Sequence, residues 1–319
     1  MRYVVVGAGA VGGVIGARLA LAGVDVTLVA RGAHLEALRS DGLVLESRVG
    51  REVTHPRAVG TPYDVDWSEK HVVLLAVKGH QTAGALDDLA AAAPPDTPVV
   101  SVQNGVANEA AVLRRFARTY GICVMQPCAH LEPGVVVQQC HPVPGLLDIG
   151  RFPAGVDDVC TTVATDLRTA GFHSVPRPDV MAWKHRKLLM NLGNVVDACC
   201  AESPAADELV RRARAEGEAV LAAAGIAVVS EEQDRERRGD LLQGRTRADA
   251  RGSTWQSLAR GTGDVETDLL NGEVVLLGRL HGVPVPVNEA LQRLGADAAR
   301  QGLAPRSLDA ADLSARLRP

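Results

Sequence analysis

The chain has 319 residues, a length typical of about two domains. Its 46% apolar residues, 23% charged residues and net charge of −4, without a basic stripe, argue against nucleic acid or an anionic membrane as its main partner. No apolar run approaches the roughly 20 residues of a membrane span, and the N-terminus resembles a strand more than a signal peptide, so we expect a cytoplasmic protein.

The first half of the chain alternates strand and helix patterns. Apolar runs predict strands over residues 2–6, 24–30, 71–77 and 99–102. Helical patterns predict helices over residues 11–22, 34–39, 82–92 and 108–118, and short β segments follow over residues 122–150. Such alternation is typical of the α/β class, here an N-terminal Rossmann domain with a doubly wound, mostly parallel sheet.

The pattern changes near Pro176-Arg177-Pro178, beyond which strand signals nearly disappear and long helical patterns dominate. We therefore expect two domains, a Rossmann domain over residues 1–177 and an all-helical domain over residues 178–319. The charge-rich segment 231–251 is expected to form a solvated helix or a mobile connection. The apolar helices of the second domain would suit a homodimer, although a single hydrophobic core would produce the same pattern.

A glycine-rich segment directly follows the first strand and opens the first helix. It comprises Gly7, Ala8, Gly9, Ala10, Val11 and Gly12 and matches GxGxxG. In a strand–helix–strand context, Gly7 permits a tight turn, Gly9 lets the backbone approach a pyrophosphate, and Gly12 lets the helix pack close to the sheet. The segment therefore predicts a dinucleotide site in which the phosphates meet the N-terminus of the helix.

The end of the second strand indicates which dinucleotide is preferred. An NAD site places Asp or Glu there to hold the ribose hydroxyls, whereas this chain reads Leu28-Val29-Ala30-Arg31-Gly32. The guanidinium of Arg31 can pair with a 2′-phosphate, so NADP is expected over NAD. A surface arginine without a ligand is the alternative interpretation.

Polar residues also end the next two strands. Lys78 follows the strand at 71–77, and Gln103-Asn104-Gly105 follows the strand at 99–102. Ligands of open α/β sheets bind outside the carboxyl ends of the strands, so Lys78 and Asn104 are candidates for contacting nicotinamide, ribose or substrate. An Asn-Gly pair is equally suited to a turn without a ligand.

A polar stripe is predicted on the helix that opens the second domain. Helical spacing places four residues on one face: Lys184, Lys187, Asn191 and Asn194. Reduction of a carbonyl group requires a proton donor, and a lysine can serve if partial burial and a second ammonium one turn away lower its pKa. Either lysine could be the donor, in an active site expected between the two domains.

Three further residues are candidates on weaker grounds. Glu266, on a helix expected to include Asn271, could orient the lysine, and either Ser253 or Ser257 could bind a substrate carboxylate. A surface role for Glu266 is equally compatible with the sequence. A last cluster matches no common zinc spacing, so no metal is expected; it comprises Cys123, Cys128, His130, Cys140 and His141.

Taken together, these segments resemble the ketopantoate reductase (2-dehydropantoate 2-reductase) family. The resemblance rests on the GxGxxG segment, Val29 to Leu35, Ala76-Val77-Lys78, Gln103-Asn104-Gly105, the Lys187-x-x-x-Asn191 helix, Glu266 ahead of Asn271-Gly272, and His281 to Asn288. It implies reduction of a small-molecule 2-keto acid, 2-dehydropantoate, to pantoate with NADPH, in pantothenate biosynthesis.

The resemblance also implies roles for single residues. Lys187 would act as general acid, and Arg31 would hold the 2′-phosphate. Asn104 and Asn191 would position the substrate. The serine near Ser253 would bind the substrate carboxylate, and Glu266 would support the site.

The substrate side of the pattern departs from the family. The family's second asparagine, four residues after the first, is Val195 here, and Asn194 lies one residue earlier. The stretch from Ser253 to Glu266 is one residue longer than usual, which leaves Ser253 and Ser257 both open. Two alternatives therefore stay in view: a non-catalytic NADP-binding sensor or partner protein, and a related reductase acting on another keto acid or on an imine.

Overall fold

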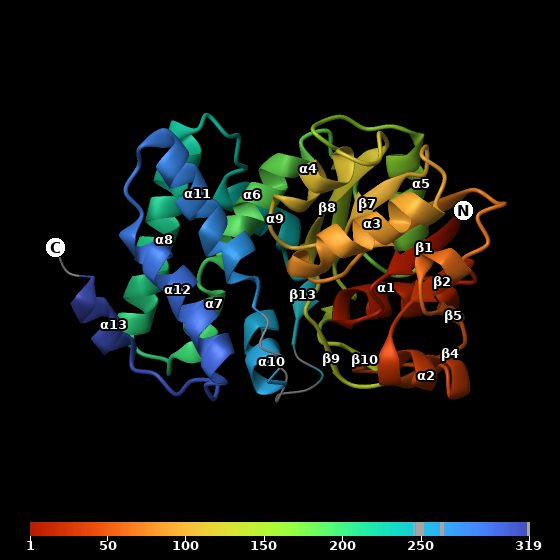
Figure 1. Ribbon diagram of the computed structural model, residues 1–319, viewed down its shortest axis with the longest axis horizontal. Coiled ribbons are helices and arrows are strands. Elements are labelled where there is room, and N and C mark those ends of the chain that lie inside the picture. The colour runs from red at the N-terminus through yellow and green to blue at the C-terminus, as the bar shows by residue number, and fades with distance from the viewer. Residues whose placement is uncertain (245, 247–251, 262–264, 318–319) are drawn as a thin grey trace. The chain divides into compact units, whose positions relative to one another are not determined.

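The computed structural model describes residues 1–244, 246, 252–261 and 265–317 (Figure 1). The chain divides into two compact units, one formed by Met1–Lys184 and Glu231–Ala248 and the other by His185–Ser230 and Asp249–Pro319. The first unit is α/β and the second is helical, which confirms the predicted fold class. A single boundary at residue 177 does not describe the return of the chain to the first unit at Glu231.

A seven-stranded sheet forms the centre of the first unit, in the order β12-β8-β7-β6-β1-β2-β5. Its strands are β1 (Arg2–Val6), β2 (Val26–Val29), β5 (Arg57–Val59), β6 (His71–Leu75), β7 (Val99–Ser101), β8 (Thr119–Met125) and β12 (Leu146–Arg151). All neighbours pair in parallel except β12, which runs antiparallel to β8. The strand order reverses at β1 and β6, where the carboxyl ends of such sheets bind ligands.

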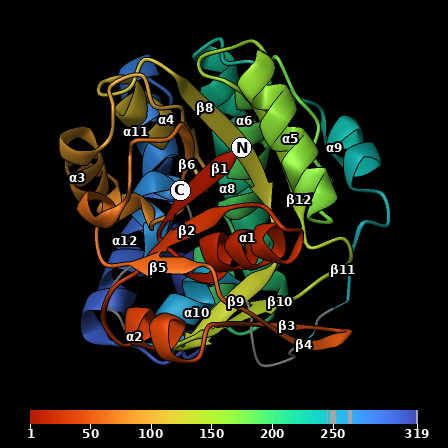
Figure 2. The same ribbon diagram turned by 90° about the vertical axis from the view of Figure 1, so that its right-hand side faces the viewer.

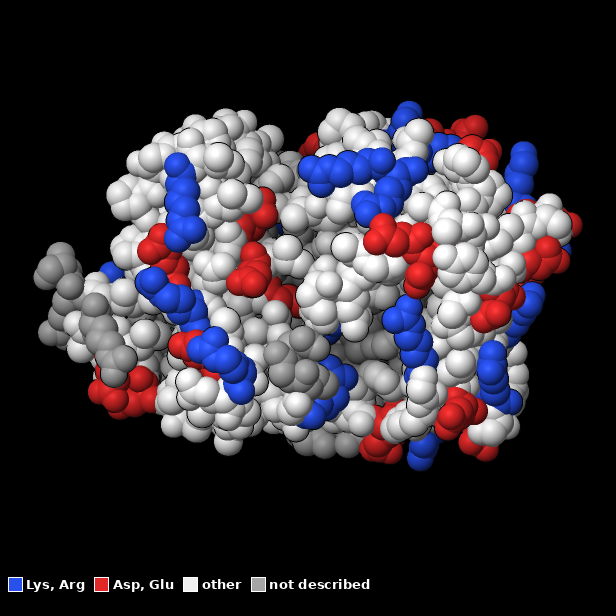
Figure 3. Space-filling view, viewed as in Figure 1, with Lys and Arg blue, Asp and Glu red and all other residues white. Residues whose placement is uncertain are grey.

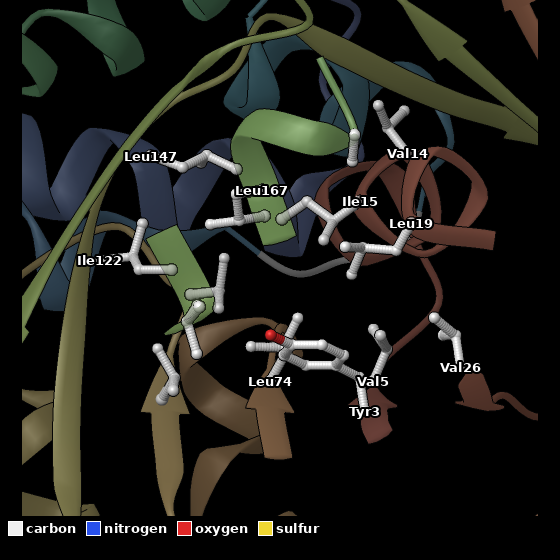
Figure 4. Close-up of a cluster of buried hydrophobic side chains, with 14 of the residues drawn as sticks. Tyr3, Val5, Val14, Ile15, Leu19, Val26, Leu74, Ile122, Leu147 and Leu167 are labelled. Carbon is white, nitrogen blue, oxygen red and sulfur yellow. The ribbon is translucent and has the colours of Figure 1, made fainter. Parts of the chain in front are cut away.

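Helices cover both faces of this sheet, as a doubly wound fold requires (Figure 2). Helices α1 (Ala10–Leu21) and α5 (Asp158–Thr169) cover one face, and α3 (Thr82–Ala92) and α4 (Asn108–Leu113) cover the other. Successive strand residues point to opposite faces, so Tyr3 and Val5 belong to the α1–α5 core whereas Val4 and Val6 belong to the α3–α4 core. Figure 4 shows the first of these cores.

A smaller sheet packs against α1. Its order is β4-β3-β10-β9, from β3 (Leu43–Ser47), β4 (Gly50–Thr54), β9 (Cys128–Glu132) and β10 (Val135–Gln138). β10 pairs in parallel with β3, about 90 residues earlier in the chain. The sequence predicted short β segments here but not this distant pairing. A two-stranded ribbon joins β11 (His141–Pro142) to β13 (Leu242–Gln243).

Helix α9 (Glu231–Arg238) belongs to the charge-rich segment that was expected to be solvated, and its inner face is instead buried. Arg237 Nε lies 2.7 Å from Asp148 Oδ2 on β12, and the Arg237 guanidinium lies 5.3 Å from the ring of Trp183. Its i,i+3 neighbour Asp234 is also buried. The charges pair inward because the chain returns here to the first unit. Residues 245 and 247–251 of the expected segment lie outside the described residues.

The second unit consists of helices packed on one another. They are α7 (Asn194–Cys199), α8 (Pro204–Ala223), α10 (Ser253–Ala259), a 3-10 helix (Glu266–Leu269), α11 (Asn271–His281), α12 (Pro286–Gln301) and α13 (Ala310–Arg316). Helix α6 (Val180–Asn191) contains the division between the units. Ser203 caps α8, accepting from the amide of Ala206 at 3.2 Å, and Pro204 occupies the first turn. Gly217 on α8 admits Leu189 and Leu192, since a Cβ there would lie 2.7 Å from Leu189 Cδ2.

None of the helices in the described part of the chain combines the length and apolar character that crossing a membrane requires. On the face drawn in Figure 3, acidic and basic side chains are interspersed and do not gather into a patch of one sign.

Candidate active site

The glycine turn, residues Gly7–Gly12, connects β1 to α1 and needs two of its glycines for the fold itself. Gly7 has φ +99°, and a Cβ there would lie 2.8 Å from the amide nitrogen of Val77. A Cβ on Gly12 would lie 2.2 Å from the carbonyl oxygen of Gly7. Both residues therefore let the turn fold back against α1 and against the end of β6.

Gly9 differs from these two because nothing in the protein requires a glycine at its position. Its φ is −73°, and a Cβ would meet none of the surrounding described residues within 4 Å. α1 begins directly after it, without an acidic residue in its first turn, and the first amides of a helix lack partners within the helix. An open glycine next to free N–H groups fits the close approach of a pyrophosphate, so these residues suit a dinucleotide.

His34 lies on α2 (Gly32–Ser40) and forms a hydrogen bond with the main chain of the glycine turn. The amide of Gly134 donates to Nδ1 at 2.9 Å, and Nε2 lies 2.8 Å from the carbonyl oxygen of Ala8. Because Nδ1 accepts, the proton of the neutral ring sits on Nε2, which donates to Ala8. Burial, and then the His130 ring at 4.3 Å, lower the pKa of His34. Sequence reasoning gave this residue no role, since its partners lie 26 and 100 positions away.

Arg31 lies where the sequence placed it, at the end of β2 and the N-cap of α2. The end of β2 adjoins the glycine turn, because the amides of Gly7 and Ala8 donate to Val29. The Arg31 side chain is 75% exposed and pairs with Asp88 on α3 at 3.2 Å. An exposed pair of this kind is weak, so the guanidinium can exchange Asp88 for a phosphate.

The segments that carry Lys78 and Asn104 adjoin the glycine turn within the first unit. Gly7 packs on Val77, and Gln103 Nε2 donates to the carbonyl oxygen of Val77 at 2.9 Å. The side chains of Lys78 and Asn104 are both half-buried, and Asn104 precedes Gly105, which has φ +80°. The structure thus brings three predicted binding segments together at the carboxyl ends of β1, β6 and β7.

Lys184 occupies a buried site that differs from its predicted place on an open polar stripe. Its Nζ lies 2.8 Å from Glu109 Oε1 and donates to the carbonyl oxygens of Gln103 at 2.8 Å and Ile122 at 3.1 Å. Glu109 pairs with this ammonium, so Lys184 does not lie on an open polar stripe as expected. With its donors engaged and 3% of its surface exposed, Lys184 is poorly suited to proton transfer. No signal in the sequence indicates that Glu109 is the partner of Lys184.

The predicted stripe is also interrupted after Asn191. Helix α6 ends there, and Asn194 begins α7, so Asn194 does not continue the face of Lys187 and Asn191 on one helix. Lys187 is half-buried and Asn191 is buried. Asn271 Nδ2 donates to the carbonyl oxygen of Leu192 at 3.1 Å, which fixes the junction between the two helices.

The remaining candidates lie in the second unit. Ser253 and Ser257 are four residues apart on α10, which packs on α7; Ser257 is buried and Ser253 is half-buried. Glu266 is half-buried and begins the 3-10 helix, so it does not share a helix with Asn271 as expected. A Cβ on Gly295 of α12 would lie 2.3 Å from Thr267 Oγ1, so the residue after Glu266 is closely packed.

In the described residues, no group of three or more His, Cys, Asp or Glu side chains is arranged to hold a metal ion. The cysteines are free thiols. Burial, reinforced by Cys140, raises the pKa of Cys128 to about 12, while the charge of Lys78 acts in the opposite direction.

Comparison with known proteins identifies the family of the chain. The family model described as "Ketopantoate reductase PanE/ApbA" matches residues 3–154, and its C-terminal counterpart matches residues 179–297. A 2-dehydropantoate 2-reductase of Halobacterium salinarum is 32% identical over 317 residues, covering 95% of this chain and 100% of that protein. One of Pyrococcus horikoshii is 30% identical over 191 residues, which span 60% of this chain and 61% of that relative.

Solved structures show the same fold. A PanE/ApbA family ketopantoate reductase of Ralstonia eutropha is 28% identical, with a TM-score of 0.80 over 95% of this chain and 99% of that one. D-mandelate dehydrogenase has the same TM-score at 20% identity, covering 95% of this chain and 100% of its own. From the two matched models and the full-length relative, the chain belongs to the ketopantoate reductase family of oxidoreductases.

Proposed function

We propose that the protein reduces 2-dehydropantoate, a branched 2-keto acid, to pantoate with NADPH, and that Lys187 donates the proton. The observation that carries the proposal is the open Gly9 of the glycine turn, flanked in the first unit by the segments of Lys78 and Asn104. The curated relatives named 2-dehydropantoate 2-reductase support the choice of substrate.

The cofactor part of the proposal assigns NADP to the first unit. NADPH, when bound, supplies the hydride that adds to the keto carbon. The amides at the start of α1 bind its pyrophosphate, and Arg31 exchanges Asp88 for the 2′-phosphate. No carboxylate stands at the end of β2, where an NAD site would hold the ribose hydroxyls.

The proton-transfer part of the proposal assigns the general acid to Lys187. Reduction leaves a developing alkoxide on the keto oxygen, and a proton donor within hydrogen-bonding reach stabilises it. Lys184 has its donors engaged within the first unit, which leaves Lys187 as the preferred lysine. Glu266 supports the Lys187 site.

The substrate part of the proposal uses amides and a serine hydroxyl. Asn104 and Asn191 orient the keto acid, and Ser253 or Ser257 binds its carboxylate. Ser253, half-buried at the start of α10, is preferred over the buried Ser257. The proposal leaves out Asn194, because it does not share a helix with Lys187.

A substrate screen that follows NADPH absorbance tests the function directly. We expect turnover with 2-dehydropantoate, weaker turnover with other branched 2-keto acids, and a marked preference for NADPH. NADH is the necessary control, since a D-mandelate dehydrogenase of the same fold is described in complex with NADH. Absence of turnover with every keto acid, alongside tight NADPH binding, would support a non-catalytic NADP-binding protein. Turnover only in the presence of an amine would indicate an imine reductase.

A further inference from the structure

We propose that the buried Glu109–Lys184 pair is a positioning device for Asn104. By fixing the main chain of the Gln103–Gly105 segment at the end of β7, the pair would set the direction in which the Asn104 amide meets substrate or nicotinamide. The inference rests on the proposed function, in which Asn104 contacts the reacting groups. It gives Glu109 and Lys184 a role through Asn104 and not in proton transfer.

The first support is the geometry of the ammonium group. Lys184 is 3% exposed and Glu109 is fully buried. The three partners of Lys184 Nζ are Glu109 Oε1 at 2.8 Å and the carbonyl oxygens of Gln103 at 2.8 Å and Ile122 at 3.1 Å. A lysine ammonium has three protons, so these partners fix its orientation.

The second support is that the bond reaches the peptide next to Asn104. The carbonyl of Gln103 and the amide nitrogen of Asn104 belong to one planar peptide group, so Lys184 fixes the plane that precedes Asn104. Asn108 Nδ2 donates to the carbonyl oxygen of Asn104 at 3.3 Å and restrains the plane that follows it. With both flanking peptides held, the Asn104 side chain moves mainly by its own torsions.

The same network reaches the segment that carries Lys78. Gln103 Nε2 donates to the carbonyl oxygen of Val77 at 2.9 Å and to Thr82 Oγ1 at 2.8 Å. Thr82 in turn donates to Asn108 Oδ1 at 2.9 Å. These hydrogen bonds therefore connect the loops after β6 and β7 in one network. The Glu109–Lys184 pair lies at one end of this network.

Energetics make a purely stabilising role a poor explanation. Removing two charges from water carries a large cost, and apolar residues of similar volume often replace a buried pair without loss of stability. Among the described residues neither carboxylate oxygen of Glu109 has a hydrogen bond, and Oε1 keeps only its ion contact with Lys184, so the pair is not fully compensated. Gly121 on β8 leaves room for the Glu109 carboxylate, because a Cβ there would lie 3.2 Å from Glu109 Oε1. Orientation of the neighbouring loop is the benefit that the pair provides.

A double replacement by apolar residues separates positioning from stability. Glu109→Leu with Lys184→Met removes both charges and leaves no buried ion uncompensated, so the chain is expected to fold. We expect kcat for 2-dehydropantoate to fall about 10- to 100-fold, because small misplacements of positioning groups cost this much. The Kd for NADPH should stay within about threefold, and hydrogen exchange at the amides of residues 103–105 should accelerate. Lys184→Arg, which keeps the charge and donors, should recover part of the loss.

Another buried pair in the first unit supplies the matched control. Arg237 and Asp148 are also buried, and the described hydrogen bonds of Arg237 go to Asp148, Cys123 and Met125, outside residues 103–105. Arg237→Met with Asp148→Asn should lower stability and leave kcat near that of the parent. Equal losses of kcat in the two double variants would overturn the inference, as would a parental kcat in the Glu109–Lys184 variant.

Two further readouts keep the outcomes distinct. If Lys184 were the proton donor itself, the residual activity of the double variant would lose the basic limb of its pH–rate profile; we expect the limb to remain. If the double variant does not fold, the same comparison is made with Glu109→Gln and Lys184→Arg. Absence of turnover in the parent enzyme would reject the proposed function, whereas unchanged hydrogen exchange at residues 103–105 would reject the positioning role.

Discussion

His34 donates a hydrogen bond of 2.8 Å to the carbonyl oxygen of Ala8, which ties the glycine turn to the first turn of α2. In the neutral ring Nδ1 also accepts from the amide of Gly134, and this second bond is the one that protonation removes. Protonation would place a second donor opposite the amide of Gly134 and would add charge beside His130. The geometry of the glycine turn thus depends on the protonation state of one histidine.

We predict that NADPH affinity weakens in acid through His34. Burial and His130 lower its pKa below the usual 6.5, so the ring is neutral near pH 7 and becomes protonated only as the pH falls below that value. The folded state disfavours the charged ring, so its stability also falls as the pH drops through this range. Fluorescence titration of His34→Phe at pH 7 should show an NADPH Kd raised about fivefold, the equivalent of one hydrogen bond. His281→Gln, at an exposed position of α11, should match the parent; an unchanged Kd in His34→Phe would reject this role.

The two glycines Gly9 and Gly12 should separate binding from folding. Gly9→Ala adds a methyl group that no surrounding residue of the described chain approaches within 4 Å, so the melting temperature should be unchanged while the NADPH Kd rises at least about 10-fold. Gly12→Ala places a methyl group 2.2 Å from the carbonyl oxygen of Gly7 and should destabilise the fold by about 1–3 kcal/mol. Calorimetry and titration of the two variants check both results, and normal NADPH binding by Gly9→Ala would place the pyrophosphate elsewhere.

Cofactor preference should depend on Arg31 and, in the opposite sense, on Asp88. Arg31→Ala should raise the KM for NADPH about 10- to 100-fold, as expected for a lost charge-assisted hydrogen bond, and should leave the KM for NADH nearly unchanged. Asp88→Ala frees the guanidinium and should lower the KM for NADPH by a small factor, because the exposed pair is weak. Arg39→Ala on the same helix is the control. Equal effects on both cofactors would argue against a 2′-phosphate contact.

The Arg237–Asp148 pair, which connects α9 to β12, should increase the free energy of unfolding. Among the described residues, Arg237→Met leaves the buried carboxylate of Asp148 with one ionic partner, Arg177 at 3.1 Å. Loss of one member of a buried pair typically costs 3–5 kcal/mol, and the remaining arginine should reduce this to about 3 kcal/mol. Urea unfolding measures the change. Stability equal to that of the parent would show that α9 is not held by this pair.

The sequence predicted the parts of the first unit that local pattern controls. Continuous apolar runs and the GxGxxG context placed β1, α1 and β6 and the residues at the ends of the strands, because each signal lies within about 30 residues. The parallel pairing of β10 with β3 could not be predicted from the sequence, because both strands are short and far apart in the chain.

Single side-chain partners were the least predictable feature. Nothing near Glu109 indicates that it meets Lys184, which lies 75 positions later, and helical periodicity alone placed Lys184 on an open stripe. The same periodicity continued one helix through residues 192 and 193, where the chain starts a new helix at Asn194. The charges of α9 looked solvated because their buried partner, Asp148, lies on a strand 89 residues earlier.

The most direct test of the account is the turnover of Lys187→Ala with NADPH and 2-dehydropantoate. We predict a kcat reduced about 10²- to 10⁴-fold, the usual contribution of a general acid, with an NADPH Kd equal to that of the parent. A kcat within about twofold of the parent would contradict the assignment of Lys187 as the proton donor.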